Sequence, residues 1–212
     1  MQFLDLTSIQ SQRIFVVGSL QGNYQKLIDI LYEQEFSYRD TLVLTGDFID
    51  KNSSKFLDIV HFLKNNDNCF SVKGKQEVEF LKEYTEDKLP DYLKDLLDIE
   101  ILGFLEKLPV AIMLPENYFI VNKGLEPLKE FSEQYDDVFY SIPHFDIESK
   151  YYQYNNVEGK SWFDFSFQPT KICFSDPLLE EVIVEAGYNL KPTLTDLVCL
   201  IIVDDSDPII IS

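Results

Sequence analysis

Three short apolar runs, each leading into a glycine-containing loop, constrain the fold of this 212-residue chain more than any other feature. Runs of this kind, without polar alternation, are typical of parallel strands that are buried on both faces of a sheet. Glycine in the loop after a strand allows a tight turn and a close backbone approach. The runs cover residues 14–17, 42–44 and 69–72, and they lead into Gly18, Gly46 and Gly74.

Helical patterns separate these runs. Leu27, Ile30 and Leu31 recur at helical spacing after the first run, and residues 56–63 carry a second apolar stripe after the second run. Strand, helix, strand, helix, strand is a βαβαβ unit, for which right-handed crossovers are expected. We therefore expect the three glycines at the carboxyl ends of neighbouring strands, where open α/β sheets gather their functional sites.

The rest of the chain has weaker patterns. A charged helical segment covers residues 78–108, and Pro90 is predicted to divide it into two helices. Further strands are predicted at the following places: 110–114 and 118–121 around a turn at 115–117, 172–174, and a hairpin formed by 197–203 and 209–211. Residues 128–165 have no clear period. No repeat or linker is visible, so a single domain over residues 1–212 is predicted.

The composition limits the classes of partner. The hydrophobic fraction of 45% suits a packed globule, and the formal charge of −19 repels nucleic acid and anionic membranes. A protein partner, if basic, would be attracted. Cys69, Cys173 and Cys199 have no paired spacing and lie in apolar runs, so we expect reduced core thiols in a cytoplasmic protein. No signal peptide or apolar run long enough to enter a membrane is expected.

Five loops carry polar residues in a recognisable order. They read Gly-Ser-Leu-Gln-Gly-Asn at 18–23, Gly-Asp-Phe-Ile-Asp-Lys at 46–51, Gly-Lys-Gln-Glu at 74–77, Val-Asn-Lys-Gly-Leu-Glu-Pro at 121–127 and Phe-Ser-Asp-Pro at 174–177. Their order and spacing resemble the motifs of calcineurin-like metallophosphoesterases, especially small bacterial and phage Ser/Thr phosphoprotein phosphatases. Those motifs read Gly-Asp-x-His-Gly, Gly-Asp-x-x-Asp-Arg, Gly-Asn-His-Glu, His before Ala/Gly-Gly-Leu, and Phe-Gly-His-Thr.

The resemblance implies a mixed α/β fold in which two mixed β-sheets pack as a sandwich flanked by helices. It also implies a two-metal hydrolase, in which two cations clamp a phosphate and activate a bridging water. The positions that it assigns to such a site are Ser19, Gln21, Asp47, Lys51, Lys75, Gln76, Asn122 and Asp176. Most of them hold the wrong residue type for that chemistry.

The resemblance places Ser19 and Gln21 where the family has the Asp and His of the first metal. Asp47 corresponds to the metal-bridging Asp and is retained. Lys75 stands at the Asn of the second metal, a cation where a cation should bind. Asn122 and Asp176 stand at the two remaining metal histidines.

The catalytic positions are also altered. Gln76 corresponds to the general-acid His, whose loss alone typically costs about 10²–10⁴-fold in rate. Lys51 corresponds to the phosphate-gripping Arg. The chain has two histidines, His61 and His144, and both lie outside the motifs. Asp50 and Glu77 are family features that mainly hold loops in place.

The residues of the scaffold are retained, whereas most of the metal-ligand positions are altered. This combination predicts an inactive, pseudophosphatase-like protein that acts as a binding or regulatory module and holds no cofactor. One alternative is a weak phosphoesterase that uses a single manganese or similar ion at Asp47, Asn122 and Asp176. Another is a metal-free protein that binds a phosphorylated ligand through Lys51, Lys75 and Lys123. We further hypothesise that the Lys75 amine replaces the metal charge by pairing with Asp47 or Asp176, the alternative being that Lys75 extends into solvent.

Overall fold

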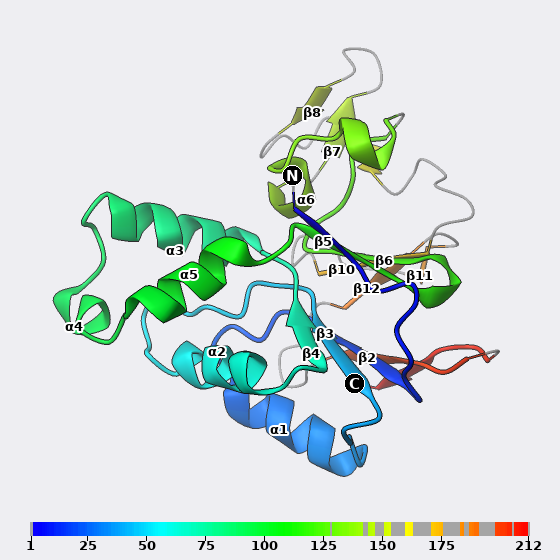
Figure 1. Ribbon diagram of the computed structural model, residues 1–212. Coiled ribbons are helices and arrows are strands. Elements are labelled where there is room, and N and C mark those ends of the chain that lie inside the picture. Colours follow the sequence, from blue (N-terminus) through cyan, green and yellow to red (C-terminus); the bar gives the residue numbers. More distant parts are fainter. Residues whose placement is uncertain are drawn as a thin grey trace.

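Two mixed β-sheets stacked on one another form the centre of the computed structural model, and helices lie against their outer faces (Figure 1). The predicted sandwich of two mixed sheets flanked by helices is confirmed. The structure describes residues 2–127, 129–141, 144–146, 151–153, 160–162, 171–175, 183–184, 187–190, 198–204 and 206–211.

The five-stranded sheet has the order β14-β13-β2-β3-β4. Its strands are β2 (Ile14–Val17), β3 (Thr41–Leu44), β4 (Cys69–Ser71), β13 (Cys199–Ile202) and β14 (Ile209–Ile211). The first three are parallel, and β13 runs antiparallel to both β2 and β14. The predicted βαβαβ unit and the C-terminal hairpin are therefore confirmed, with β2 as the central strand.

The six-stranded sheet has the order β1-β5-β6-β10-β12-β11. Its strands are β1 (Phe3–Asp5), β5 (Ala111–Leu114), β6 (Tyr118–Val121), β10 (Lys171–Phe174), β11 (Ile183–Val184) and β12 (Gly187–Asn189). A 3₁₀ turn at Pro115–Asn117 joins β5 to β6, as the turn signal predicted. Strands β1, β11 and β12 were not predicted, because two or three residues are too few to display a period.

A third, small sheet was not predicted either. It has the order β8-β7-β9 and consists of β7 (His144–Asp146), β8 (Tyr151–Gln153) and β9 (Lys160–Ser161). These strands fall within residues 128–165, for which the sequence pattern gave no period. The same region holds a 3₁₀ turn at Phe131–Glu133 and α6 (Val138–Ser141).

The main helices are α1 (Tyr24–Glu33), α2 (Phe56–Asn65), α3 (Lys75–Thr85), α4 (Asp91–Lys94) and α5 (Ile99–Lys107). The prediction of two helices between residues 78 and 108 is wrong, because three are present. Pro90 separates α3 from α4 as expected. Asp98 then starts α5, since its carboxylate accepts the Ile101 N–H at 2.7 Å, which is an N-cap.

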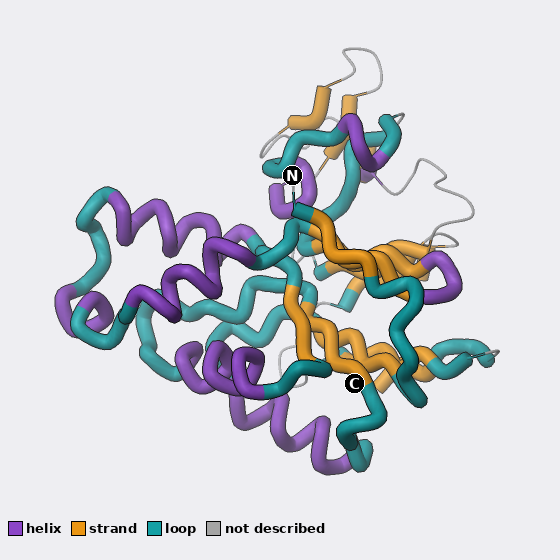
Figure 2. Tube along the Cα trace, viewed as in Figure 1, coloured by secondary structure: helices purple, strands orange, loops and turns teal. Residues whose placement is uncertain are grey.

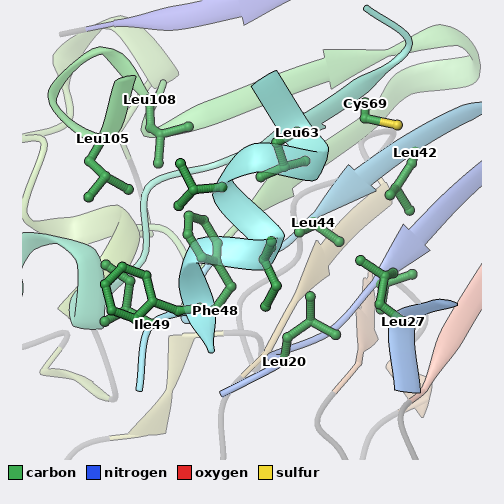
Figure 3. Packing of buried hydrophobic residues seen from close by; sticks show 14 of the residues in the cluster. Leu20, Leu27, Leu42, Leu44, Phe48, Ile49, Leu63, Cys69, Leu105 and Leu108 are labelled. Carbon is green, nitrogen blue, oxygen red and sulfur yellow. The ribbon is translucent and has the colours of Figure 1, made fainter. Parts of the chain in front are cut away.

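Side-chain alternation along β2 divides the core into layers. Ile14 and Val16 face the six-stranded sheet, while Phe15 and Val17 face the helices. Figure 3 shows the helix-side cluster, in which Leu44 and Phe48 lie among side chains from α1, α2 and α5, including Leu27, Leu63 and Leu105. This packing fixes the ends of β2, β3 and β4, and those ends carry the loops discussed below.

Two further expectations concern the cysteines and the possibility of a membrane-spanning helix. All three cysteines are buried and free, as predicted, and burial raises the thiol pKa of Cys69 and Cys199 to about 12. None of the helices in the described ranges has the length and apolar character needed to cross a bilayer. Figure 2 draws the helices in purple and the strands in orange, and the four longest helices contain 9–11 residues each.

Candidate functional site

The loops that follow β2, β3, β4, β6 and β10 gather at one edge of the sandwich. The glycines predicted to end neighbouring strands do so, since β2, β3 and β4 are adjacent and parallel. Gly46 has a φ of +82°, and a Cβ added there would lie 2.7 Å from the Gly74 nitrogen. Only glycine permits this approach of the second and third loops.

Glu77 fastens those two loops together. Its side chain is fully buried, and its two carboxylate oxygens accept four backbone N–H groups at 2.8–3.1 Å. The donors are Asp47, Phe48 and Ile49 in the second loop and Gly74 in the third. Burial, and after it the charge of Asp47, raises the pKa of Glu77 to about 7, while the N–H donors act in the opposite direction. The sequence-based expectation that Glu77 holds loops in place is confirmed.

Asp47 lies at the centre of the site in a left-handed backbone conformation, with a φ of 54°. Its side chain is about nine-tenths buried. One carboxylate oxygen, Oδ1, accepts the backbone N–H of Gln76 at 2.9 Å, at the start of α3. The other, Oδ2, lies 3.0 Å from the Lys123 Nζ, whose side chain is 10% exposed. The retained carboxylate is therefore paired with a buried ammonium.

Lys123 links three loops through this ammonium. The residue itself belongs to the loop after β6, and its Nζ also donates to the backbone carbonyl of Ser175 at 2.9 Å, after β10. Asp47 comes from the loop after β3, in the opposite sheet. One cation therefore connects the two sheets at the edge where the motif loops meet.

The hypothesis that Lys75 supplies the counter-charge is wrong for Asp47. Lys75 is the first residue of α3, and its exposed side chain makes no ion pair with the described residues. Its backbone N–H does face the site and donates to Asn122 Oδ1 at 3.2 Å. The helix start thus turns the backbone of Lys75 inward and leaves the amine outside. Asp176, the other proposed partner, lies outside the described residues.

Asn122 and Ser19 are buried, and both side chains are hydrogen-bonded to protein groups. The amide nitrogen of Asn122 donates to the Thr45 carbonyl at 2.8 Å, and its oxygen accepts from Lys75 as above. The Ser19 hydroxyl lies 2.8 Å from the Ser175 hydroxyl. Both side chains therefore tie neighbouring loops to each other.

The remaining predicted positions lie at the rim. Gln21 is exposed and, with Asp50, lines an open cavity of about 510 Å³ beside α1. Lys51 lies 2.8 Å from Glu83 and 3.3 Å from Glu79 on α3, and its hydrogen bond to Glu83 raises its pKa. His61 is exposed on α2 and His144 lies in β7, so neither enters the motif loops.

The side chains in these loops that could bind a metal can be compared with the ligands that a two-metal centre needs. Divalent cations of that kind require several carboxylate, imidazole or amide ligands. Across the described ranges, no three side chains of His, Cys, Asp or Glu are placed so that they could hold a metal ion. The one central carboxylate already pairs with Lys123, and the Asn122 amide is already bonded. The described residues do not fit two divalent cations.

Comparisons with known proteins address the resemblance directly. The sequence model of the calcineurin-like phosphoesterase family matches residues 12–186, well over half of the chain. A symmetrical bis(5'-nucleosyl)-tetraphosphatase of Shigella dysenteriae is 28% identical over an alignment of 123 residues, which covers 53% of this chain and 43% of that protein. The corresponding protein of Escherichia coli K12 gives 28% identity over 123 residues, 53% of this chain and 44% of that protein. The match thus spans less than half the length of these curated relatives.

Solved structures agree on the fold. A crystal structure of a protein assigned as a diadenosine tetraphosphatase aligns with a TM-score of 0.83 at 22% identity, covering 99% of this chain and 97% of that one. A Ser/Thr phosphatase from Saccharomyces cerevisiae, similar to human phosphatase PP5, gives a TM-score of 0.63 at 17% identity, covering 100% of this chain and 82% of that one. At these identities the likeness concerns the fold alone.

Proposed function

The chain belongs to the calcineurin-like phosphoesterase family, and from that premise we propose that it is a member without phosphatase activity, which acts as a binding or regulatory module. The observation that carries the proposal is the Lys123 ammonium 3.0 Å from Asp47 Oδ2. In the family this carboxylate bridges two cations. Here a single positive charge, tethered to the chain, occupies the face of the carboxylate that a metal would need.

Electrostatics supports the proposal. Asp47 and Lys123 are both about nine-tenths buried, so water screens their charges only weakly. A divalent cation approaching Asp47 would meet the repulsion of the ammonium before it gained the carboxylate. Displacing the ammonium would also leave Lys123 buried without a partner, which is costly.

The catalytic groups are a second support. By the motif resemblance Gln76 corresponds to the general acid, and an amide does not donate a proton usefully at neutral pH. By the same resemblance Lys51 corresponds to the phosphate-gripping Arg, but Lys51 is already paired with Glu79 and Glu83. The same ion pairs weaken the alternative of a phosphate-binding site built on Lys51 and Lys123. Three buried free thiols are consistent with a cytoplasmic location, which is part of the proposal.

The experiment is a hydrolysis assay of the purified full chain with Mn²⁺. We expect no measurable turnover of p-nitrophenyl phosphate, of phosphopeptides or of diadenosine tetraphosphate, the last because curated relatives carry that activity in their names. Calorimetric titration with Mn²⁺ should give no saturable heat. Asp47→Asn is the matched control, since asparagine tolerates the left-handed backbone and removes the charge.

Turnover that disappears in Asp47→Asn would overturn the proposal and favour the single-metal phosphoesterase. Turnover that is unchanged in that variant would indicate a contaminating enzyme. In that case the hydrolysis rate should fall to the background rate once the protein is purified further. Saturable binding of inorganic phosphate without turnover would favour the phosphorylated-ligand alternative instead.

A further inference from the structure

The far end of the helical region α3 to α5 exposes several large apolar side chains. We call residues 83–100 the helical tip; it comprises the end of α3, all of α4 and the start of α5. Its exposed apolar side chains are Tyr84, Tyr92, Leu96 and Ile99, and Ile99 is 86% exposed. Figure 1 shows α4 at the left extremity of the molecule, away from both sheets.

These side chains are not the remainder of an incomplete core. Leu89 and Leu93, which lie between them in the sequence, are buried at 3% and 0% exposure and anchor the tip to the helices behind it. The tip therefore has its own buried anchors and, beside them in the sequence, four exposed large apolar side chains within residues 84–99. Exposed large apolar side chains that gather in one place typically mark an interaction surface.

The helical tip is also strongly acidic. Residues 83–100 contain seven carboxylates and two lysines, a formal charge of −5. Lys51 and Lys64, which lie outside the tip, offset two of these charges by pairing with Glu83 and Glu100. Both lysines of the tip are already engaged within it, Lys88 with Glu86 and Lys94 with Asp87 and Asp91. Asp95 is exposed and has no cationic partner in the described part of the chain. A cation from outside would meet uncompensated negative charge.

We propose that the helical tip is a docking site for a basic amphipathic protein segment, one that presents lysine or arginine side chains next to apolar ones. The apolar side chains of the segment would cover Tyr92, Leu96 and Ile99, and its cations would pair with the surrounding carboxylates. Charge selects this occupant. A second copy carries −19 overall and brings the same acidic tip, and anionic lipids and nucleic acids are repelled for the same reason.

The test uses the full chain and three synthetic peptides of about 18 residues, five helical turns. The first has leucine and lysine at amphipathic helical spacing, the second replaces each lysine by glutamate, and the third replaces each leucine by serine. Fluorescence anisotropy should show binding of the leucine–lysine peptide, at least tenfold weaker binding of the serine–lysine peptide, and no binding of the leucine–glutamate peptide.

Variants locate the site. Tyr92→Ser and Ile99→Ser keep the charge of the tip and should each weaken binding of the leucine–lysine peptide about tenfold, as expected for central apolar contacts. Asp95→Asn should weaken binding more at low salt than at high salt. Tyr32→Ser is the matched control, because Tyr32 is 84% exposed on α1 and lies outside the tip; binding should not change. Circular dichroism checks that each variant is folded.

Three results would overturn the proposal. Equal binding of the two lysine peptides would mean attraction by the net charge alone. An equal loss in Tyr32→Ser would mean that the tip is not the site. A dimer of the free chain in sedimentation that Ile99→Ser abolishes would assign the tip to self-association. None of these outcomes depends on hydrolysis, so this proposal and the proposed function can fail separately.

Discussion

Replacing Lys123 by methionine should destabilise the chain by about 3–5 kcal/mol, because it leaves the buried Asp47 carboxylate without its counter-charge. Methionine keeps most of the side-chain volume, so the effect reports the charge rather than a cavity. The hydrogen bond from Nζ to the Ser175 carbonyl is lost as well. Urea unfolding of the purified variant gives the change in the free energy of unfolding.

Two further variants make this measurement specific. Lys75→Met removes a lysine from the same site region, but its side chain is exposed, so the cost should stay below about 1 kcal/mol. The double variant Lys123→Met with Asp47→Asn leaves no unpaired charge and should recover a large part of the lost stability. If Lys123→Met unfolds at the wild-type urea concentration, or if Lys75→Met is the costlier change, the assignment of the counter-charge to Lys123 is wrong.

Replacing Glu77 by glutamine should cost about 3–5 kcal/mol, because four N–H groups converge on its two oxygens. Glutamine can accept from the donors at one end only, and its NH₂ group would face two further N–H donors at the other. Because folding raises the pKa of Glu77 from 4.5 to about 7, ionisation of Glu77 lowers the stability of the fold as the pH rises between those values. The variant and the wild type are therefore compared at one pH, pH 8, where the carboxylate is ionised. Urea unfolding again gives the free energy of unfolding.

The control for this prediction is Glu79→Gln, two residues along the same helix. Glu79 is 41% exposed, and in the described part of the chain it pairs with Lys51, which also pairs with Glu83. The loss of Glu79 should therefore cost less than about 1 kcal/mol. Hydrogen exchange adds a second readout: the amides of Phe48 and Ile49 should lose protection in Glu77→Gln and keep it in Glu79→Gln. Protection that is unchanged in Glu77→Gln would contradict the role of Glu77 as the clamp between the two loops.

Most of the sandwich could be predicted from the sequence, because its longer strands and helices leave a clear hydrophobic pattern in the sequence. The runs at β2, β3 and β4 are continuous because both of their faces are buried, and the stripes on α1 and α2 repeat because one face of each helix packs on the sheet. Strands β1, β11 and β12 consist of two or three residues each, so pairing with neighbours, rather than local pattern, determines them.

The candidate site was predicted in part. The motif spacing correctly brought Ser19, Asp47 and Asn122 into one group of loops, since parallel strands end at a common edge. The motif spacing did not identify the residue that pairs with Asp47. An alignment relates positions in the sequence, whereas charge pairing depends on where a side chain points. The resemblance sets Lys75 against a metal ligand, but Lys75 begins a helix and its side chain is exposed. Lys123 aligns with no ligand, yet it follows Asn122 directly and its long side chain reaches Asp47.

The ion pair between Lys123 and Asp47 also determines what the folded chain requires from its surroundings. A bound ion has a dissociation constant, so the fraction of molecules with an ordered site varies with the supply of that ion. A lysine in the same polypeptide has no such dependence, because it is present at a fixed, high effective concentration from the moment the chain is complete. The positive charge that faces Asp47 in these loops is therefore supplied by the sequence itself, so we expect chelators to leave the stability of the folded chain unchanged.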